Sequence, residues 1–215
     1  MNGKPRILRP TADPAERALL VGDPGRALLL ATELLKTPAP MFNHHRGLWG
    51  YCGPAADDSG RVMVQGTGVG GPSLNAVLTD LAELGVGRVV RLGTATSAEL
   101  QLGSVLIASS ASRPPQGPQS ANGDLLRRAV SEVVTASDGA VISADIHLQP
   151  TLGAIPSPAL AADLSTATLY EKAQALGVSA LSILVVTESP AGRASDEEIE
   201  RSMKAIAPIA LKLLK

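Results

Sequence analysis

Aromatic residues are almost absent from this chain of 215 residues, which has one Trp, two Tyr and one Phe, or 2% of the total. Proteins that bind single-stranded nucleic acid stack the bases on aromatic side chains, and this sequence has too few to build such a platform. The formal net charge is −1, so no electrostatic field attracts a polyanion. Both observations argue against a nucleic-acid partner.

Cysteine and long apolar runs are also scarce. Cys52 is the only cysteine, so an internal disulfide is excluded. No apolar run approaches the roughly 18 residues of a membrane span, and the start, MNGKPRILRP, lacks the apolar core of a signal peptide. We expect a cytoplasmic protein without a membrane partner. The apolar content of 45% suffices for one domain over residues 1–215, with an irregular arm over 1–17.

Glycine is abundant, and its densest cluster opens the segment 64–97, around which the rest of the chain is organised. Apolar residues recur at helical spacing over 74–84, and an apolar strand over 89–92 is predicted to stop at Gly93-Thr94. Such a β-loop-α-β unit has glycine-rich strand ends, where backbone N–H groups can approach an anion closely. In open α/β sheets, ligands bind at this edge.

Arg91 lies inside this otherwise apolar strand, and a buried charge without a partner is very costly. One interpretation is a structural ion pair with a carboxylate such as Asp80 or Glu83. The other is that Arg91 and Thr94 hold a bound anion. The sequence leaves both interpretations open.

A second candidate anion site lies near the start of the chain. A short strand over 18–21 runs into Gly22, and a helix follows with Asp23 as its N-cap and Pro24 in its first turn. Arg26 lies one turn in, so a strand end and a helix N-terminus could hold an anion together. The alternative is an ordinary capped helix with a solvated arginine.

Local patterns also predict the elements between and after these segments. His44 and His45 are adjacent and would face opposite sides of a strand, so we predict no metal site. Residues 51–66 have the pattern of a hairpin. Helices are expected over 124–134 and over 195–215, the second opened by a capping box.

Four separated stretches together resemble the hexameric branch of the nucleoside phosphorylase family, and most closely its bacterial purine members. They are VGDPGR (21–26), NHHRGLWGY (43–51), GTGVGGPS (66–73) and RLGT (91–94), in the family's order and spacing. The resemblance implies an α/β fold whose central mixed β-sheet curls towards a barrel and is flanked by helices. It also implies a ring-shaped homo-hexamer, a trimer of dimers. Its substrates would be a nucleoside and inorganic phosphate, with no further cofactor.

The resemblance also assigns roles to individual positions. It places phosphate on Gly22, Arg26, Arg46, Arg91 and Thr94, with Arg46 reaching into the neighbouring subunit's site. It places the nucleoside on Arg6, Thr96, His147, Asp163, Leu164 and Ser165, and the protonation of the leaving base on Glu188, assisted by Arg201. Three guanidiniums and a helix N-terminus suit a small dianion. Phosphate would then attack C1′ through an oxocarbenium-like transition state.

The nucleoside side of this predicted site departs from the family. Ser165 replaces a glutamate that grips the ribose hydroxyls, so ribose affinity should fall by about 2–4 kcal/mol. A helix is expected to begin near Ala162, and Asp163 should not compensate, because residues two apart on a helix do not face each other. Glu188 replaces an aspartate, and its extra methylene moves the acidic proton by about 1.5 Å.

Four further positions differ from the family. Arg6 replaces a histidine, Leu164 a methionine, Thr96 a glycine and His147 an aromatic residue. Arg6 would suit an acidic substituent or simply lie on the surface, His147 could stack on the base or pack, and Arg201 could be solvated. The sequence therefore leaves three hypotheses: an active phosphorylase, a diverged relative that binds phosphate or a phosphorylated small molecule, and a nucleoside hydrolase. The phosphate-site arginines argue against the third.

Overall fold

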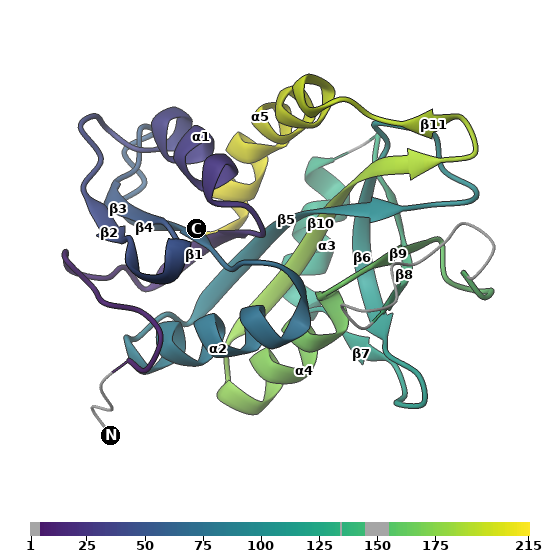
Figure 1. Cartoon of the computed structure of the whole chain (residues 1–215), viewed down its shortest axis with the longest axis horizontal. Helices are drawn as coiled ribbons and strands as arrows, with labels where there is room; N and C mark the ends of the chain where they lie inside the picture. The colour runs from purple at the N-terminus through teal and green to yellow at the C-terminus, as the bar shows by residue number, and fades with distance from the viewer. Residues whose placement is uncertain (1–4, 134, 145–154) are drawn as a thin grey trace.

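A computed structural model describes residues 5–133, 135–144 and 155–215. Its centre is a mixed sheet of 11 strands in the order β11-β10-β6-β8-β9-β5-β1-β4-β3-β2, with β7 paired to β6 (Figure 1). The strands are β1 (Arg17–Val21), β2 (Met41–Asn43), β3 (Gly50–Pro54), β4 (Arg61–Gly66), β5 (Arg88–Thr96), β6 (Val105–Ser112), β7 (Gln119–Ser120), β8 (Ser137–Ser143), β9 (Ala161–Asp163), β10 (Ser179–Ser189) and β11 (Gly192–Arg193).

Part of this sheet closes on itself. β10 pairs with β6 in antiparallel and with β5 in parallel, while β9 joins β8 to β5, so that β5, β10, β6, β8 and β9 form a closed barrel. β1, β4, β3 and β2 extend from β5 as an open sheet. A bulge between Val186 and Glu188 interrupts the long strand β10, and bulges bend a strand locally. The predicted α/β fold with a sheet that curls into a barrel is confirmed.

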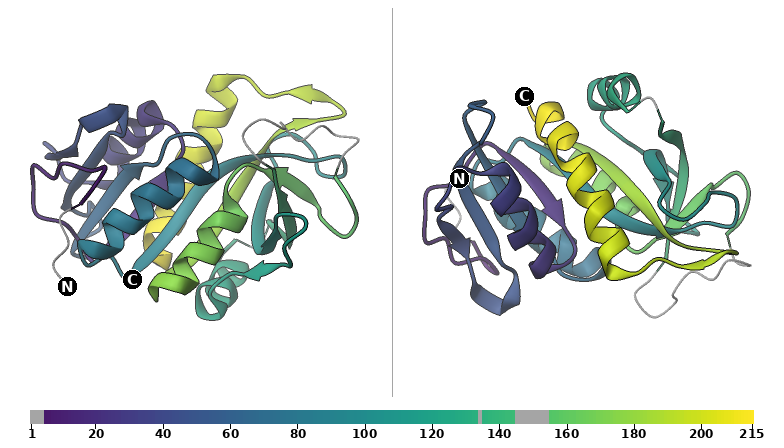
Figure 2. Two further views of the ribbon diagram at one scale, coloured as in Figure 1. Left: turned by 60° about the horizontal axis from the view of Figure 1, so that its bottom comes forward. Right: turned by 90° about the horizontal axis from the view of Figure 1, so that it is seen from above.

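Helices cover both faces of the sheet. The pair α1 (Pro24–Leu34) and α5 (Asp196–Leu213) lies on one face, the pair α2 (Gly70–Glu83) and α4 (Thr166–Leu176) lies on the other, and α3 (Gly123–Glu132) packs against the barrel (Figures 1 and 2). α2 and α4 touch at Gly71, where a Cβ atom would lie 2.4 Å from Oγ1 of Thr168. None of the helices in the described ranges is long and apolar enough to cross a bilayer.

Several helix and strand ends follow local sequence signals, and others do not. The Asp23 cap of α1, the Ser195–Glu198 capping box of α5 and the hairpin of β3 and β4 are confirmed. The strand predicted to stop at Gly93 continues to Thr96, because β10 keeps pairing with β5 that far. α2 begins at Gly70, so the last two glycines of the cluster, Gly70 and Gly71, lie in its first turn.

The prediction of a helix beginning near Ala162 was wrong. Residues Ala161–Asp163 form β9, which pairs in parallel with β8, and Ser165 is the N-cap of α4. Asp163 and Ser165 therefore do not share a helix, and the helical argument that Asp163 cannot act beside Ser165 fails. A three-residue strand has too little pattern to distinguish it from the first turn of the helix that follows.

The N-terminal arm is anchored to α2. The backbone N–H groups of Arg6, Ile7 and Leu8 donate hydrogen bonds to the Asp80 carboxylate at 2.9, 2.6 and 2.8 Å, and the Leu8 side chain is fully buried. Asp80 is itself only 1% exposed. Buried carboxylates need such donors, because desolvation without them is costly. Asp80 thus orders the arm as far as Arg6.

Asp80→Asn is expected to lower the free energy of unfolding by about 1.5–3 kcal/mol, because charge-assisted hydrogen bonds from the arm are weakened. Urea unfolding measures the change. Asp138→Asn is the matched control: Asp138 is exposed on β8, and its substitution should change stability by less than about 0.5 kcal/mol. Equal effects of the two variants would contradict the anchoring role of Asp80.

Candidate active site

The carboxyl ends of four strands meet at one edge of the sheet. β1 runs parallel to β4 and β5, and β5 runs parallel to β10. In this register Val21 lies opposite Gly66 and Leu92, and Thr94 lies opposite Val185. Ligands of α/β sheets collect at such an edge. The two anion sites predicted separately at Gly22 and at the glycine cluster therefore adjoin.

The glycine-rich loop is fastened directly to the end of β1. Thr67 donates to the carbonyl oxygen of Val21 through its backbone N–H at 2.7 Å and its hydroxyl at 3.1 Å. Ser73 in α2 donates from its hydroxyl to the Thr67 carbonyl at 2.6 Å. Gly68 has φ 73°, which favours glycine, and its carbonyl oxygen approaches Gly22. The loop is thus held against the strand end.

The Arg91 side chain is 7% exposed and is held through one nitrogen. Its Nη1 lies 3.1 Å from Oδ2 of Asp163, 3.1 Å from Oγ of Ser182 and 3.3 Å from Oγ1 of Thr166. The interpretation that Arg91 forms a structural ion pair is confirmed, but its partner is neither Asp80 nor Glu83. Asp80 is occupied by the arm, and β9 brings Asp163 to the arginine instead.

The other edge of the same guanidinium has no hydrogen-bond partner among the described residues. Nε of Arg91 is buried without a hydrogen bond, and Nη2 makes none within the described part of the chain. Nε and Nη2 form the fork that binds two oxygens of a phosphate or carboxylate. Gly93 makes room for this group, because a Cβ there would lie 2.3–2.7 Å from the guanidinium atoms. An unpartnered buried donor requires an explanation, and an anionic ligand provides one.

Asp163 is fully engaged at the N-terminus of α4. Oδ1 accepts from the Ser143 hydroxyl at 2.6 Å and from the backbone N–H groups of Ser165 and Thr166 at 3.2 and 3.1 Å. Oδ2 accepts from Arg91, from the Thr166 hydroxyl at 2.6 Å and from the Thr166 N–H at 3.1 Å. Ser165 beside it is 4% exposed and makes no side-chain capping bond. Leu164 is partly buried.

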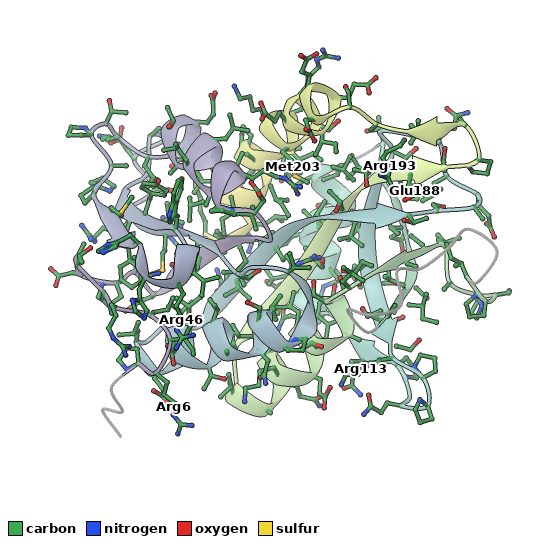
Figure 3. All side chains as sticks on the ribbon, in the orientation of Figure 1. Arg6, Arg46, Arg113, Glu188, Arg193 and Met203 are labelled. Atoms are coloured by element: carbon green, nitrogen blue, oxygen red, sulfur yellow. The ribbon has the colours of Figure 1, made fainter. Side chains whose placement is uncertain are left out.

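Arg46 lies on an exposed segment with unusual backbone geometry. Its φ is 58° and its ψ is 21°, in the left-handed region that non-glycine residues rarely adopt. Asn43, which is fully buried, holds this segment by donating to the carbonyl oxygen of Leu48 at 2.5 Å. Arg46 and Arg6 lie at one end of the molecule and Glu188 lies at the opposite end (Figure 3). Within one chain, Arg46 and Glu188 do not meet.

Glu188 pairs with an arginine that the sequence did not suggest. Its side chain is 41% exposed and lies 3.4 Å from Nη2 of Arg193, which faces it across the β10–β11 hairpin. The burial expected for an acid is therefore not met. Arg201 is exposed on α5 and lines a cavity of about 210 Å³ together with Gly103 and Val185. No hydrogen bond or ion pair between described residues joins Arg201 to Glu188.

The remaining predicted residues do not gather in one place in the described part of the chain, although Thr96 lies opposite Glu188 in the pairing of β5 with β10. Arg26 lines a cavity of about 500 Å³ between α1 and α5, on the face of the sheet opposite α4. Thr94 and Thr96 are partly buried at the end of β5, and Arg6 is exposed. His147 lies outside the described residues. In the described ranges, no group of three or more His, Cys, Asp or Glu is placed to hold a metal ion.

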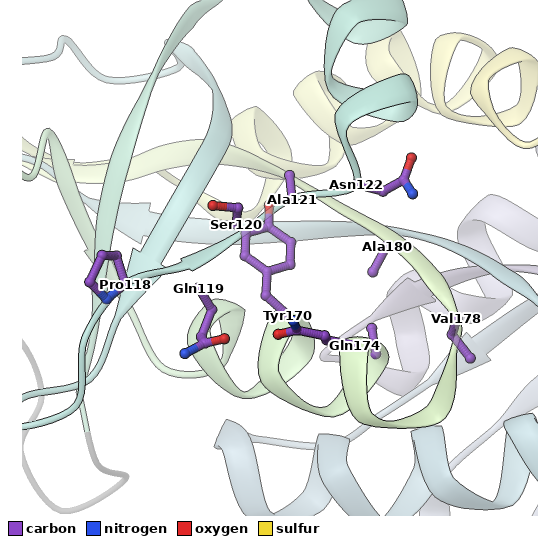
Figure 4. A pocket seen from close by; sticks show the side chains of 10 residues that line it. Pro118, Gln119, Ser120, Ala121, Asn122, Tyr170, Gln174, Val178 and Ala180 are labelled. Carbon is purple, nitrogen blue, oxygen red and sulfur yellow. The ribbon is translucent and has the colours of Figure 1, made fainter.

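A further cavity, of about 430 Å³, opens beside the second half of α4 (Figure 4). Tyr170 lies on its wall, and its hydroxyl donates to the Ala108 carbonyl and accepts from the Ser182 N–H at 3.0 Å. Burial raises the pKa of Tyr170, so the hydroxyl stays protonated. The cavity lining includes Gln174 and Val178, near the end of α4 opposite Thr166. This cavity is therefore separate from the candidate anion site.

The sequence matches the Phosphorylase superfamily over residues 16–215. The chain is 31% identical over 222 residues to the DeoD-type purine nucleoside phosphorylase of Alkaliphilus metalliredigens, covering 93% of this chain and 94% of that protein. It is 33% identical over 224 residues to the protein of that type from Caldanaerobacter subterraneus subsp. tengcongensis, covering 94% and 95%. The chain therefore belongs to the phosphorylase superfamily, and the family expected from the four motifs is confirmed.

The fold itself has a solved counterpart. Uridine phosphorylase from Vibrio fischeri ES114, solved in complex with 6-hydroxy-1-naphthoic acid, superposes with a TM-score of 0.82 and 19% sequence identity. The match covers 94% of this chain and 91% of that one. At this identity the likeness bears on the fold alone.

Proposed function

We propose that this protein catalyses the phosphorolysis of a purine nucleoside, or a related ribosyl compound, to the free base and ribose 1-phosphate in the cytoplasm. Inorganic phosphate is the co-substrate and no further cofactor takes part. The observation that carries this proposal is the Nε–Nη2 edge of Arg91, a buried fork of two donors with no partner among the described residues. The proposal is also supported by the two relatives that match almost the whole chain, because both are named purine nucleoside phosphorylases.

In the proposed reaction, phosphate binds to Gly22, Arg91 and Thr94, to Arg46 of a neighbouring subunit, and to Arg26 once its side chain turns from the cavity between α1 and α5 towards the strand ends. A phosphate oxygen bonds to C1′ as the bond from C1′ to the base breaks, and Glu188 gives a proton to the departing base. Positioning and charge stabilisation in the oxocarbenium-like transition state supply most of the rate. Glu188 must break its ion pair with Arg193 before it can contact the base, and Arg201 assists Glu188 in protonating the base. The proposed nucleoside contacts are Arg6, Thr96, His147, Leu164 and Ser165.

Arg46 leads us to propose a homo-oligomer, a hexamer built as a trimer of dimers. An exposed arginine held at φ 58° costs the isolated chain about 1–3 kcal/mol, a strain characteristic of functional residues. It lies at the end of its own molecule opposite Glu188. Binding of the Arg46 side chain in the site of a neighbouring subunit would explain why this strained conformation is kept.

One observation favours a second candidate function, a diverged member that binds phosphate or a phosphorylated small molecule but cleaves nucleosides poorly. Ser165 is buried, carries no carboxylate and has no side-chain capping bond. A neutral hydroxyl binds ribose hydroxyls more weakly than a carboxylate does. The residues that bind phosphate would be retained, while binding of the ribose hydroxyls would be weakened.

The two candidates are separated by measuring base release from inosine, adenosine, guanosine and uridine, with and without phosphate. Base release that requires phosphate supports a phosphorylase, and the nucleosides that are cleaved identify the base class. Ser165→Glu is run alongside, and under the first proposal it should alter the nucleoside KM more than the phosphate KM. No release, with phosphate still protecting the protein against thermal unfolding, would favour the second candidate.

A further inference from the structure

We propose that Asp163 is a positioning residue for Arg91: together with Thr166 it holds Nη1 and leaves the Nε–Nη2 edge to phosphate, and it does not bind the nucleoside. This inference rests on the proposed function and refines its site. It gives Asp163 a different role from the nucleoside contact that the family resemblance implies.

The hydrogen bonds of Asp163 leave no capacity for ribose. A carboxylate has about four lone-pair sites, and both oxygens of Asp163 already accept from Arg91, Ser143, Ser165 and Thr166. The side chain is 0% exposed, so a substrate hydroxyl cannot reach it without displacing one of these donors. The carboxylate also lies at the N-terminus of α4, where a negative charge is stabilised.

Thr166 links the two charges. Its hydroxyl accepts from Nη1 of Arg91 at 3.3 Å and donates to Oδ2 of Asp163 at 2.6 Å. Ser182 adds a third acceptor for Nη1 at 3.1 Å. The planar guanidinium is thereby fixed in orientation, and its opposite edge is fixed with it. Asp163 does not contact the ligand and affects phosphate binding only by fixing the orientation of the Nε–Nη2 edge of Arg91.

A positioning role and a nucleoside-binding role predict different kinetics. If Asp163 orients Arg91, its loss weakens phosphate binding and leaves nucleoside binding almost unchanged. If Asp163 contacts ribose, the nucleoside KM rises instead. A purely structural role would lower stability and leave both KM values unchanged in the protein that remains folded.

The test uses Asp163→Asn, Thr166→Val and the matched control Thr166→Ser, which keeps the hydroxyl. Asp163→Asn and Thr166→Val should each raise the phosphate KM about tenfold or more, as expected for a lost charge-assisted contact. The nucleoside KM should stay within about twofold, and Thr166→Ser should behave like the natural protein. Thr166→Val keeps both charges, so it remains informative if Asp163→Asn fails to fold.

Calorimetric titration with inorganic phosphate separates this inference from the proposed function, because it requires no turnover. Weaker phosphate binding in Thr166→Val than in Thr166→Ser supports the positioning role even if the natural protein releases no base. Unchanged or tighter phosphate binding in both substituted proteins, or a rise confined to the nucleoside KM, would overturn it. A natural protein that neither cleaves nucleosides nor binds phosphate would overturn both proposals.

Discussion

Replacing Arg91 with methionine is expected to lower the free energy of unfolding by about 3–5 kcal/mol and to remove phosphate binding. Asp163 has a side-chain exposure of 0% and forms its ion pair with Arg91, so the substitution leaves a buried carboxylate without its counter-charge. The four other donors from Ser143, Ser165 and Thr166 reduce this cost and do not replace the charge. Urea unfolding and phosphate calorimetry measure the two effects.

The double variant Arg91→Met with Asp163→Asn separates stability from ligand binding. Asparagine is neutral and its amide oxygen can still accept from the N-terminus of α4, so most of the lost stability should return. Phosphate binding should not return, because the guanidinium is missing. A single Arg91→Met variant that keeps its stability within about 1 kcal/mol, or still binds phosphate, would contradict this account of the pair.

Arg46→Ala and Glu188→Gln should each reduce the turnover of the proposed reaction by about 100-fold or more, and mixing the two proteins should restore activity. In the proposed dimer each subunit supplies Arg46 to the site of the other. A dimer with one subunit of each variant therefore contains one site that carries neither substitution. Random reassembly of equal amounts therefore yields about a quarter of the sites intact. Activity is measured after the subunits have been mixed under mild denaturation and reassembled.

Glu188→Gln mixed with Arg201→Ala is the matched control. The proposal places both residues in the site of their own subunit, so no mixed dimer contains an intact site and no activity should return. Recovery in this control, or its absence in the Arg46 mixture, would contradict a site shared between subunits. Light scattering on the same samples shows whether the subunits associate.

Elements whose signals are local could be predicted from the sequence. The Asp23 cap and Pro24 place the start of α1, and the Ser195 capping box places the start of α5, because in both the deciding contacts lie within a few residues. The glycine-rich loop and the end of β1 were each predicted as part of an anion site. Parallel pairing of β1 with β4 and β5 then brings them to one edge.

The contacts of the site that are distant in sequence could not be predicted. Arg91 and Asp163 are 72 residues apart, and which carboxylate meets the arginine depends on barrel closure through the short strand β9. Ser182 lies within an apolar run, and no spacing indicates that it accepts from Arg91. The Arg193 partner of Glu188 had a usable signal, since the Pro190–Ala191 turn places the two residues opposite each other.

The sugar product of nucleoside cleavage tests the central claim most directly. Purified protein is incubated with inosine and inorganic phosphate, and phosphorus NMR and chromatography follow the products. We expect ribose 1-phosphate in equal amount to hypoxanthine, with neither formed when phosphate is left out. Hypoxanthine accompanied by free ribose, at a rate independent of phosphate, would make water the nucleophile and contradict a phosphate site at Arg91.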